Sequence, residues 1–326
     1  MSASVTFFGV RGSTPCSCDS LRRYGGNTSC VVIRAPGEEP LILDLGTGLR
    51  FFGAEQHPGG PFRASALVTH LHWDHVQGIP FFPPLLVEGS QLDLYAPHQL
   101  DGSLEEVVTG FLSPPYFPVG LGELPCEIRF HELSAESFEL PGARVRSAWV
   151  PHVGPTLGYR IEVGDVAIAY ISDHQQPGVG SFAVDDAVLE ICDGADLLIH
   201  DAQYDEMEFA LRSDWGHCSV DYAAQVAAAA GVDTLVLFHH DPSHTDERID
   251  ALVAHTSERA SGLGVREVVA AHEGLTVHLA GRPRPSGRRA DRSRLGVARR
   301  GVSGRRSRPG CTACGPPPWG GRARCR

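Results

Sequence analysis

The 326-residue sequence contains no lysine, so arginine supplies all 28 of its basic side chains. Residues 1–280 carry 14 arginines against 38 acidic residues, whereas residues 281–326 carry 14 arginines against a single aspartate. A body this acidic repels phosphates except where metal ions or arginines collect. The charge balance therefore argues against general binding of nucleic acid by the first 280 residues.

Long apolar runs are also missing. No run approaches the ~20 residues that a membrane-spanning helix needs, and residues 1–9 have neither the basic nor the long apolar segment of a signal peptide. At 42% hydrophobic and 21% charged residues, the composition is that of an ordinary globular protein. We therefore expect a cytoplasmic protein with no membrane partner.

The nine cysteines show no spacing that is typical of an extracellular disulfide framework. Only Cys311 and Cys314 have metal or redox spacing, and they have no second pair nearby. They lie in a segment, from Gly281 onward, that is rich in Arg, Gly, Pro and Ser and cannot bury a core. We expect one domain over residues 1–280 and a disordered tail over 281–326, which either binds anions non-specifically or has no function.

The sequence does contain a dense group of metal-ligating side chains. His70, His72, Asp74 and His75 fall within six residues, directly after the apolar run 66–68, which is predicted to be a buried strand. Open α/β sheets place ligand sites at the carboxyl ends of their strands. Three imidazoles and a carboxylate without a basic neighbour suit a divalent metal ion better than a solvated turn does.

Further histidines and aspartates follow other predicted strands in the same way. These are His152, Asp173, the pair His200 and Asp201, and the pair His239 and His240. Four such cases at one sheet edge favour a shared site. Of the adjacent histidines, His239 is preferred as a ligand because it directly follows its strand.

Two divalent ions ~3.5–4 Å apart need about seven protein ligand positions and a bridging carboxylate. We predict that one ion is held by His70, His72 and His152, the other by Asp74, His75 and His239, with Asp173 as the bridge. Such ions lower the pKa of a shared water and neutralise charge on a phosphoryl oxygen. Ligands without cysteine favour Zn²⁺ and also allow Mn²⁺ or Fe²⁺.

The order of predicted elements indicates an α/β (α+β) fold. Strands come first and a β/α alternation follows in each half, which suits two sheets packed face to face with helices outside. Helices are predicted over 184–192, 219–230 and 245–257, the second with Ser219 as its N-cap. The glycine-rich turn 44–48 either cradles a phosphate or forms a tight turn beneath the metal loop.

The chain resembles the metallo-β-lactamase superfamily over residues 5 to 279. Within it, the chain is most similar to the phosphodiesterase branch that holds ribonuclease Z, the phosphoribosyl cyclic phosphodiesterases and the class II cyclic-nucleotide phosphodiesterases. The matching segments are 8–15, 26–29, 43–48, the metal loop 70–75, and 217–219. The resemblance implies an αββα sandwich of two mixed β-sheets with helices on the outer faces, and a homodimer is compatible with it.

The resemblance also implies catalytic roles. Asp74 marks occupation of a second metal position, and Asp201 orients His217 as a general acid that protonates the leaving alkoxide. The alternative for His217 is a cap on the following helix. Arg11 is expected to contact the substrate phosphate.

The expected substrate is a small phosphodiester, such as a cyclic nucleotide or a cyclic sugar phosphate. Relatives that process transfer RNA insert a long arm between the third histidine and the bridging aspartate, but His152 and Asp173 are only 21 positions apart. With the acidic body, this spacing leads to the expectation that a large RNA is not the substrate. The alternatives are a thioester or lactone hydrolase, a non-catalytic nucleotide-binding sensor, and an RNA nuclease that grips through the basic tail.

Overall fold

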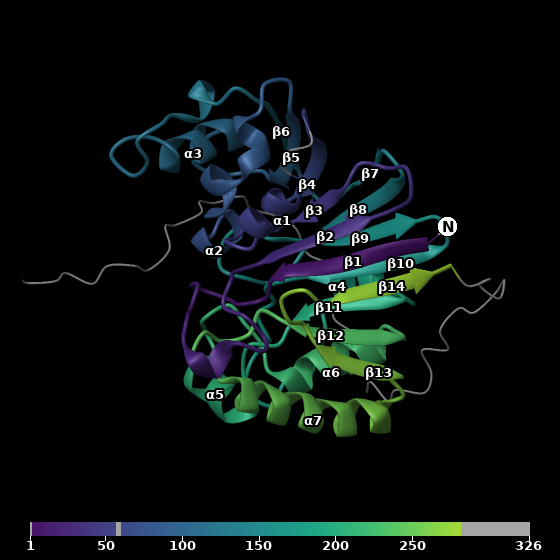
Figure 1. The fold of residues 1–326 in the computed structure, drawn as a ribbon. Helices are drawn as coiled ribbons and strands as arrows, with labels where there is room; N and C mark the ends of the chain where they lie inside the picture. The colour runs from purple at the N-terminus through teal and green to yellow at the C-terminus, as the bar shows by residue number, and fades with distance from the viewer. Residues whose placement is uncertain (1, 57–59, 282–326) are drawn as a thin grey trace, which may run out of the picture. The chain divides into compact units, whose positions relative to one another are not determined.

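The computed structural model describes residues 2–56 and 60–281, and in this part of the chain two seven-stranded sheets form the framework (Figure 1). The first sheet has the order β14-β1-β2-β3-β4-β5-β6 and the second the order β13-β12-β11-β10-β9-β8-β7. The strands are β1 (Ser2–Gly9), β2 (Cys30–Arg34), β3 (Leu41–Leu43), β4 (Arg63–Leu67), β5 (Gln91–Pro97), β6 (Glu127–Leu133), β7 (Ser137–Leu140), β8 (Ala143–Trp149), β9 (Leu157–Val163), β10 (Val166–Ile171), β11 (Leu197–Asp201), β12 (Thr234–Phe238), β13 (Glu267–Ala270) and β14 (Thr276–Ala280).

Both sheets are mixed. Strands β3 to β6 are parallel to one another, whereas β14, β1, β2 and β3 pair antiparallel. In the second sheet, β10 to β13 are parallel and β7 to β10 are antiparallel. Because β8 and β10 are both antiparallel to β9, these two strands end at the same edge as β11 and β12.

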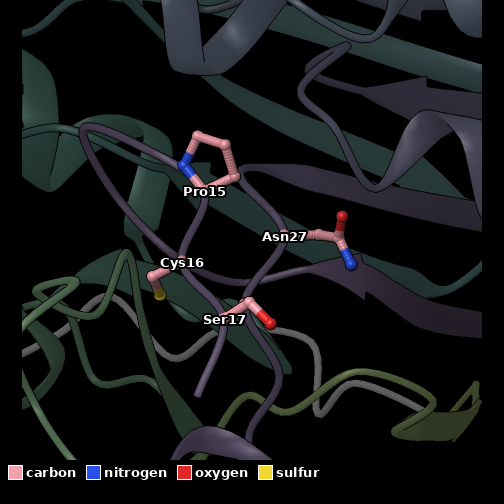
Figure 2. Close-up of a pocket in the computed structure, with 5 residues that line it drawn as sticks. Pro15, Cys16, Ser17 and Asn27 are labelled. Carbon is pink, nitrogen blue, oxygen red and sulfur yellow. The ribbon is translucent and has the colours of Figure 1, made fainter.

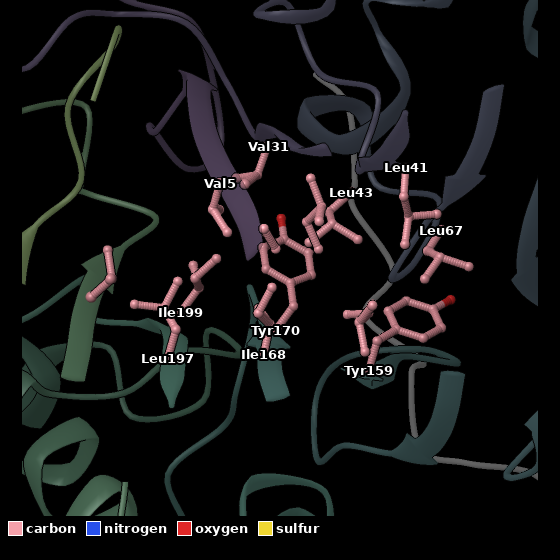
Figure 3. Packing of buried hydrophobic residues seen from close by; sticks show 14 of the residues in the cluster. Val5, Val31, Leu41, Leu43, Leu67, Tyr159, Ile168, Tyr170, Leu197 and Ile199 are labelled. Atoms are coloured by element: carbon pink, nitrogen blue, oxygen red, sulfur yellow. The ribbon is translucent and has the colours of Figure 1, made fainter. Parts of the chain in front are cut away.

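The main core lies between the two sheets. Val5, Leu43 and Leu67 from the first sheet pack against Tyr159 and Tyr170 from the second, and all five are fully buried (Figure 3). The face-to-face packing follows from apolar residues on the inner face of each strand. Two further apolar clusters lie on the outer faces, between each sheet and its helices.

The described helices are α1 (Leu49–Gln56), α2 (Trp73–Val76), α3 (Leu104–Phe111), α4 (Asp186–Cys192), α5 (Glu206–Leu211), α6 (Val220–Ala229) and α7 (Asp246–Leu263). Helices α1 and α3 pack on the first sheet, and α4, α6 and α7 on the second. The predicted αββα arrangement of two mixed sheets is thereby confirmed. None of these helices is both long and apolar enough to cross a membrane.

Local boundaries differ from the expectation in two places. Helix α7 continues past residue 257 to Leu263 because Ala260 still packs into the core, and it ends at Gly264 in the left-handed conformation. Strand β7 was not predicted, since its four residues are too few to show a periodic pattern. The tail 282–326, with Cys311 and Cys314, lies outside the described residues, and its expected disorder stays a prediction.

Candidate metal centre

The predicted ligands come from strand ends that meet at one edge of the sandwich. The first sheet supplies His70 and His72 from the loop after β4, and Asp74 and His75 from the short helix α2 that follows. The second sheet supplies His152 after β8, Asp173 after β10 and His239 after β12. The carboxyl ends of parallel strands lie together, so residues far apart in sequence converge here.

The structure brings all seven predicted ligands into overlapping groups. The ligand atoms of His70, His72 and His152 lie within 4.8 Å of one another, and so do those of Asp74, His75 and His239. These groups coincide with the two predicted ligand sets.

Asp173 is shared between the two sets. It groups with His70 and His75, and its Oδ1 lies 3.2 Å from His75 Nε2 while its Oδ2 lies 3.8 Å from His70 Nε2. A further group joins Asp173, His217 and His239. Asp173 thus lies where a bridging carboxylate would be needed.

Unpaired polar atoms test whether these residues fit metal ions. His70 Nε2, His75 Nε2 and Asp173 Oδ1 are buried, and none has a hydrogen-bond partner within the described residues. Buried nitrogen and oxygen atoms are costly to leave unpaired. Imidazole nitrogens and carboxylate oxygens that face one another without hydrogen bonds are the donor set of a divalent ion. The residues present therefore fit the implied metals.

The charges within the cluster also suit metal binding. Burial lowers the pKa of His70, His72 and His152, which favours the neutral imidazole that can ligate. Burial alone would raise the pKa of Asp74, but the adjacent imidazoles of His75 and His239 hold it well below its usual value. Asp74 is thus an anionic side chain that could bind a metal ion.

Outer contacts fix the orientation of the ligand rings. His75 Nδ1 donates to Asp44 Oδ2 at 2.8 Å, and His239 Nδ1 donates to Gln203 Oε1 at 2.9 Å. Each bond leaves Nε2 free for a metal, as outer-shell partners of metal-bound histidines do. His152 Nδ1 donates in the same way to the carbonyl oxygen of Gly216 at 2.7 Å.

Sequence reasoning placed Asp44 only in a turn and missed this contact. Asp44 is fully buried, and besides His75 it accepts hydrogen bonds from the Tyr170 hydroxyl at 2.7 Å and the Thr69 amide at 2.7 Å. The available signal was its position directly after β3, the same context that singled out Asp173 and His239.

The turn that begins at Asp44 packs directly under the metal loop. The Gly46 amide donates to the Ser29 carbonyl, and a Cβ at Gly46 would lie 2.3 Å from the backbone oxygen of Asp74. Glycine is therefore required for the close approach of two backbones. This geometry favours the structural interpretation of the turn over a phosphate cradle.

His217 and Asp201 form a hydrogen-bonded pair beside the cluster. His217 Nδ1 lies 3.0 Å from Asp201 Oδ2, and its ring centroid is 5.0 Å from that of His239. Burial alone lowers the pKa of His217, but the charge and hydrogen bond of Asp201 raise it to about 9. The cap of helix α6 is Ser219, which accepts from the Tyr222 amide, so His217 is not the cap.

The adjacent histidines point in different directions. His239 Nε2 lies 3.0 Å from Asp74 Oδ2 and 3.4 Å from Asp173 Oδ1. His240 Nε2 instead donates to the carbonyl oxygen of Ala271 at 3.0 Å. The geometry thus agrees with the preference for His239.

The structure does not place Arg11 where a substrate phosphate could contact it. Its side chain is fully buried, and its guanidinium donates to the backbone carbonyls of Gly25, Asp241 and His244 at 2.8, 3.0 and 2.8 Å. These carbonyls belong to segments that are distant in sequence. Arg11 therefore ties the loops around the site together.

Replacing Arg11 with methionine should destabilise the fold. Three carbonyls would lose a charged donor, and we expect the free energy of unfolding to fall by roughly 3 kcal/mol. Urea unfolding followed by circular dichroism measures this, with exposed Arg63→Met as the control. A raised KM with unchanged stability would instead support the substrate-contact expectation.

A cavity of about 400 Å³ lies beside the loop that follows Arg11 (Figure 2). Its lining residues are Pro15, Cys16, Ser17, Gly26 and Asn27. None of them is a predicted ligand, and burial raises the pKa of the Cys16 thiol, which keeps it protonated. This cavity is therefore not the predicted metal centre.

Comparisons with known proteins agree with the fold and the ligand pattern. Residues 52–240 match the model of the beta-lactamase superfamily domain. This match covers more than half of the chain, and the chain therefore belongs to the beta-lactamase superfamily. It is a hydrolase of the metallo-β-lactamase fold.

Individual proteins resemble this chain in sequence or in structure. The chain is 27% identical to Ribonuclease Z of Synechococcus sp. (strain CC9311), over 78% of this chain and 93% of that protein. It also superposes on the metallo-beta-lactamase fold protein YhfI from Bacillus subtilis, with a TM-score of 0.62, 18% identity, and coverage of 85% and 99% of the two chains. Human tRNase Z, short form, gives a TM-score of 0.60, 21% identity, and coverage of 85% and 99%.

These relatives correct one expectation. Proteins named Ribonuclease Z match most of this chain, and this contradicts the inference that a large RNA substrate is disfavoured. Net charge was a poor guide because a phosphate responds to the local field of nearby metals and arginines rather than to the total charge. The short interval between His152 and Asp173 does not decide the substrate either.

Proposed function

We propose that the protein is a phosphodiesterase that uses two divalent metal ions. The observation that carries the proposal is the set of seven ligand-type side chains in two interlocked groups, with the His217–Asp201 pair beside them. Bound ions would polarise the phosphoryl group and activate a water for attack. Zn²⁺ suits the ligands best, and Mn²⁺ or Fe²⁺ are alternatives.

The chain's own residues supply the remaining chemistry. Since the Nδ1 hydrogen of His217 is held by Asp201, Nε2 is the atom that donates a proton to the leaving alkoxide. This acid favours a phosphodiester over a thioester, whose thiolate leaves without a proton. RNA and small cyclic phosphodiesters both contain the bond in question, and the names of the relatives support including RNA.

The test is a substrate panel on the full chain loaded separately with Zn²⁺, Mn²⁺ and Fe²⁺. We expect hydrolysis of bis(p-nitrophenyl) phosphate, and of at least one of a transfer RNA precursor, a cyclic nucleotide and a cyclic sugar phosphate. Metal content is measured on the same samples, and a thioester and a lactone serve as comparison substrates. Metal-loaded protein that cleaves the thioester or lactone but no phosphodiester would overturn the proposal.

A further inference from the structure

The segment 212–217 joins the end of α5 to His217 and carries an exposed aromatic ring. Trp215 has 62% of its surface exposed, two residues before the proposed general acid. A single exposed apolar residue is common on protein surfaces and needs no explanation. Two further observations distinguish Trp215: hydrogen bonds fix the loop that carries it, and the charged side chain of Arg212 lies against its ring.

The loop is clamped on both sides of Trp215. The Gln175 side chain donates to the Ser213 carbonyl at 2.8 Å and accepts from the Gly216 amide at 2.8 Å. The ligand His152 donates to the Gly216 carbonyl, and Gly216 has φ of 93°, a left-handed value that favours glycine. The exposed indole is therefore held in place rather than carried on a loose loop.

Arg212 lies against this indole with its charge uncompensated. Its guanidinium carbon is 5.3 Å from the ring centroid of Tyr204 and 5.6 Å from that of Trp215. Within the described residues, no hydrogen bond or ion pair to this guanidinium is found, whereas nearby Arg248 pairs with Asp205 and Glu208. In so acidic a body, an arginine held only by aromatic rings is available for an anion.

Arg212 and Trp215 lie close to the proposed general acid, His217. The ring of Tyr204 is 5.9 Å from that of His217 and also contacts Arg212, so a single aromatic ring separates the cation from the general acid. His217 faces the leaving group in the proposed reaction. Arg212 and Trp215 therefore lie on the leaving-group side of the bond to be cleaved.

We propose that Trp215 and Arg212 form a subsite for a nucleotide on the leaving-group side, in which the base stacks on the indole and a phosphate pairs with the guanidinium. The inference rests on the proposed function, since it takes the orientation of the substrate from His217. Stacking on an aromatic side chain combined with an arginine contact is how proteins hold single-stranded nucleic acid. A free nucleotide offers the same two groups. The shared chemistry is a nucleobase next to a phosphate.

The test is equilibrium binding to the full, metal-loaded chain. Adenosine 5′-monophosphate, ribose 5-phosphate and inorganic phosphate contain no phosphodiester, so binding is read without turnover. Trp215→Ala should weaken binding of adenosine 5′-monophosphate roughly tenfold and leave ribose 5-phosphate unchanged, because only the stacking is lost. Arg212→Gln should weaken both, and Trp215→Phe should restore most of the affinity for the nucleotide.

Arg50 and Phe51 provide a matched control. The Arg50 guanidinium carbon lies 5.7 Å from the exposed Phe51 ring, the same kind of contact, but on α1. Arg50→Gln and Phe51→Ala should leave binding unchanged. A short oligoribonucleotide distinguishes the two ligands that this subsite could bind, an RNA strand and a free nucleotide. Affinity for the oligoribonucleotide above that for the mononucleotide, lost in Arg212→Gln, indicates an RNA strand. Equal affinity indicates a free nucleotide.

Hydrolysis of bis(p-nitrophenyl) phosphate by the same preparations separates the two proposals. Inactive protein would count against the proposed function alone, whereas active protein in which Trp215→Ala and Phe51→Ala bind the nucleotide equally well would overturn the subsite.

Discussion

Asp74→Ala is expected to abolish turnover and to reduce the bound metal from about two ions per chain to about one. Asp74 Oδ2 lies 3.0 Å from His239 Nε2 and 3.2 Å from His75 Nε2. Removing this carboxylate leaves that predicted metal position with two imidazoles and only the shared Asp173, a set that would hold an ion poorly. The other position, at His70, His72 and His152, keeps its ligands.

Metal content by mass spectrometry and activity on bis(p-nitrophenyl) phosphate measure this outcome together. Asp93→Ala is the matched control, because Asp93 also pairs with a histidine, His131, at 2.8 Å but lies outside the centre. Asp74→Asn separates charge from packing, since an amide oxygen can still accept from the Ser13 amide. A variant that keeps both ions and full activity would show that Asp74 is not a ligand.

His217→Ala is expected to lower kcat roughly 10²–10⁴-fold while both ions stay bound, because a general acid is lost and no metal ligand. The effect should depend on the leaving group. A nitrophenolate leaves without a proton, so bis(p-nitrophenyl) phosphate should lose little activity, whereas a diester with an alkyl leaving group should lose most of it.

Metal analysis decides between the two roles that the geometry allows His217. Its ring also groups with Asp173 and His239, so a ligand role predicts loss of metal and an equal effect on both diesters. The control is His255→Ala, which removes another histidine hydrogen-bonded to an aspartate, Asp221, at 2.8 Å on the outer helices. Asp201→Asn should reproduce much of the His217→Ala effect, since Asp201 orients the imidazole.

The residues predicted as ligands lie together in the structure, and their convergence could be predicted because its signals were local. Asp173 and His239 each lie at the end of a buried apolar strand. This position can be recognised in the sequence without knowing how the strands pair. Since the carboxyl ends of such strands align at one sheet edge, placing each residue in its own strand was enough to place them together. Ser219 as a helix N-cap was local in the same way.

Arg11 shows where this reasoning failed. Because Gly12 and Ser13 follow it, Arg11 looks like an exposed residue of a flexible loop. Its partners, however, include the carbonyl of His244, 233 positions later in the chain. No periodicity or spacing contains that contact, because it exists only once the two halves of the sandwich have packed.

The sequence by itself thus determined the candidate ligands, most of the strands and the sheet edge at which the candidates meet, since these depend on side-chain chemistry and on short-range pattern. Only the tertiary structure decided the surroundings of Arg11, Asp44 and Arg212. Each of these side chains is defined by partners from other elements, and whether a charge is buried, shared or free depends on packing rather than on sequence neighbours.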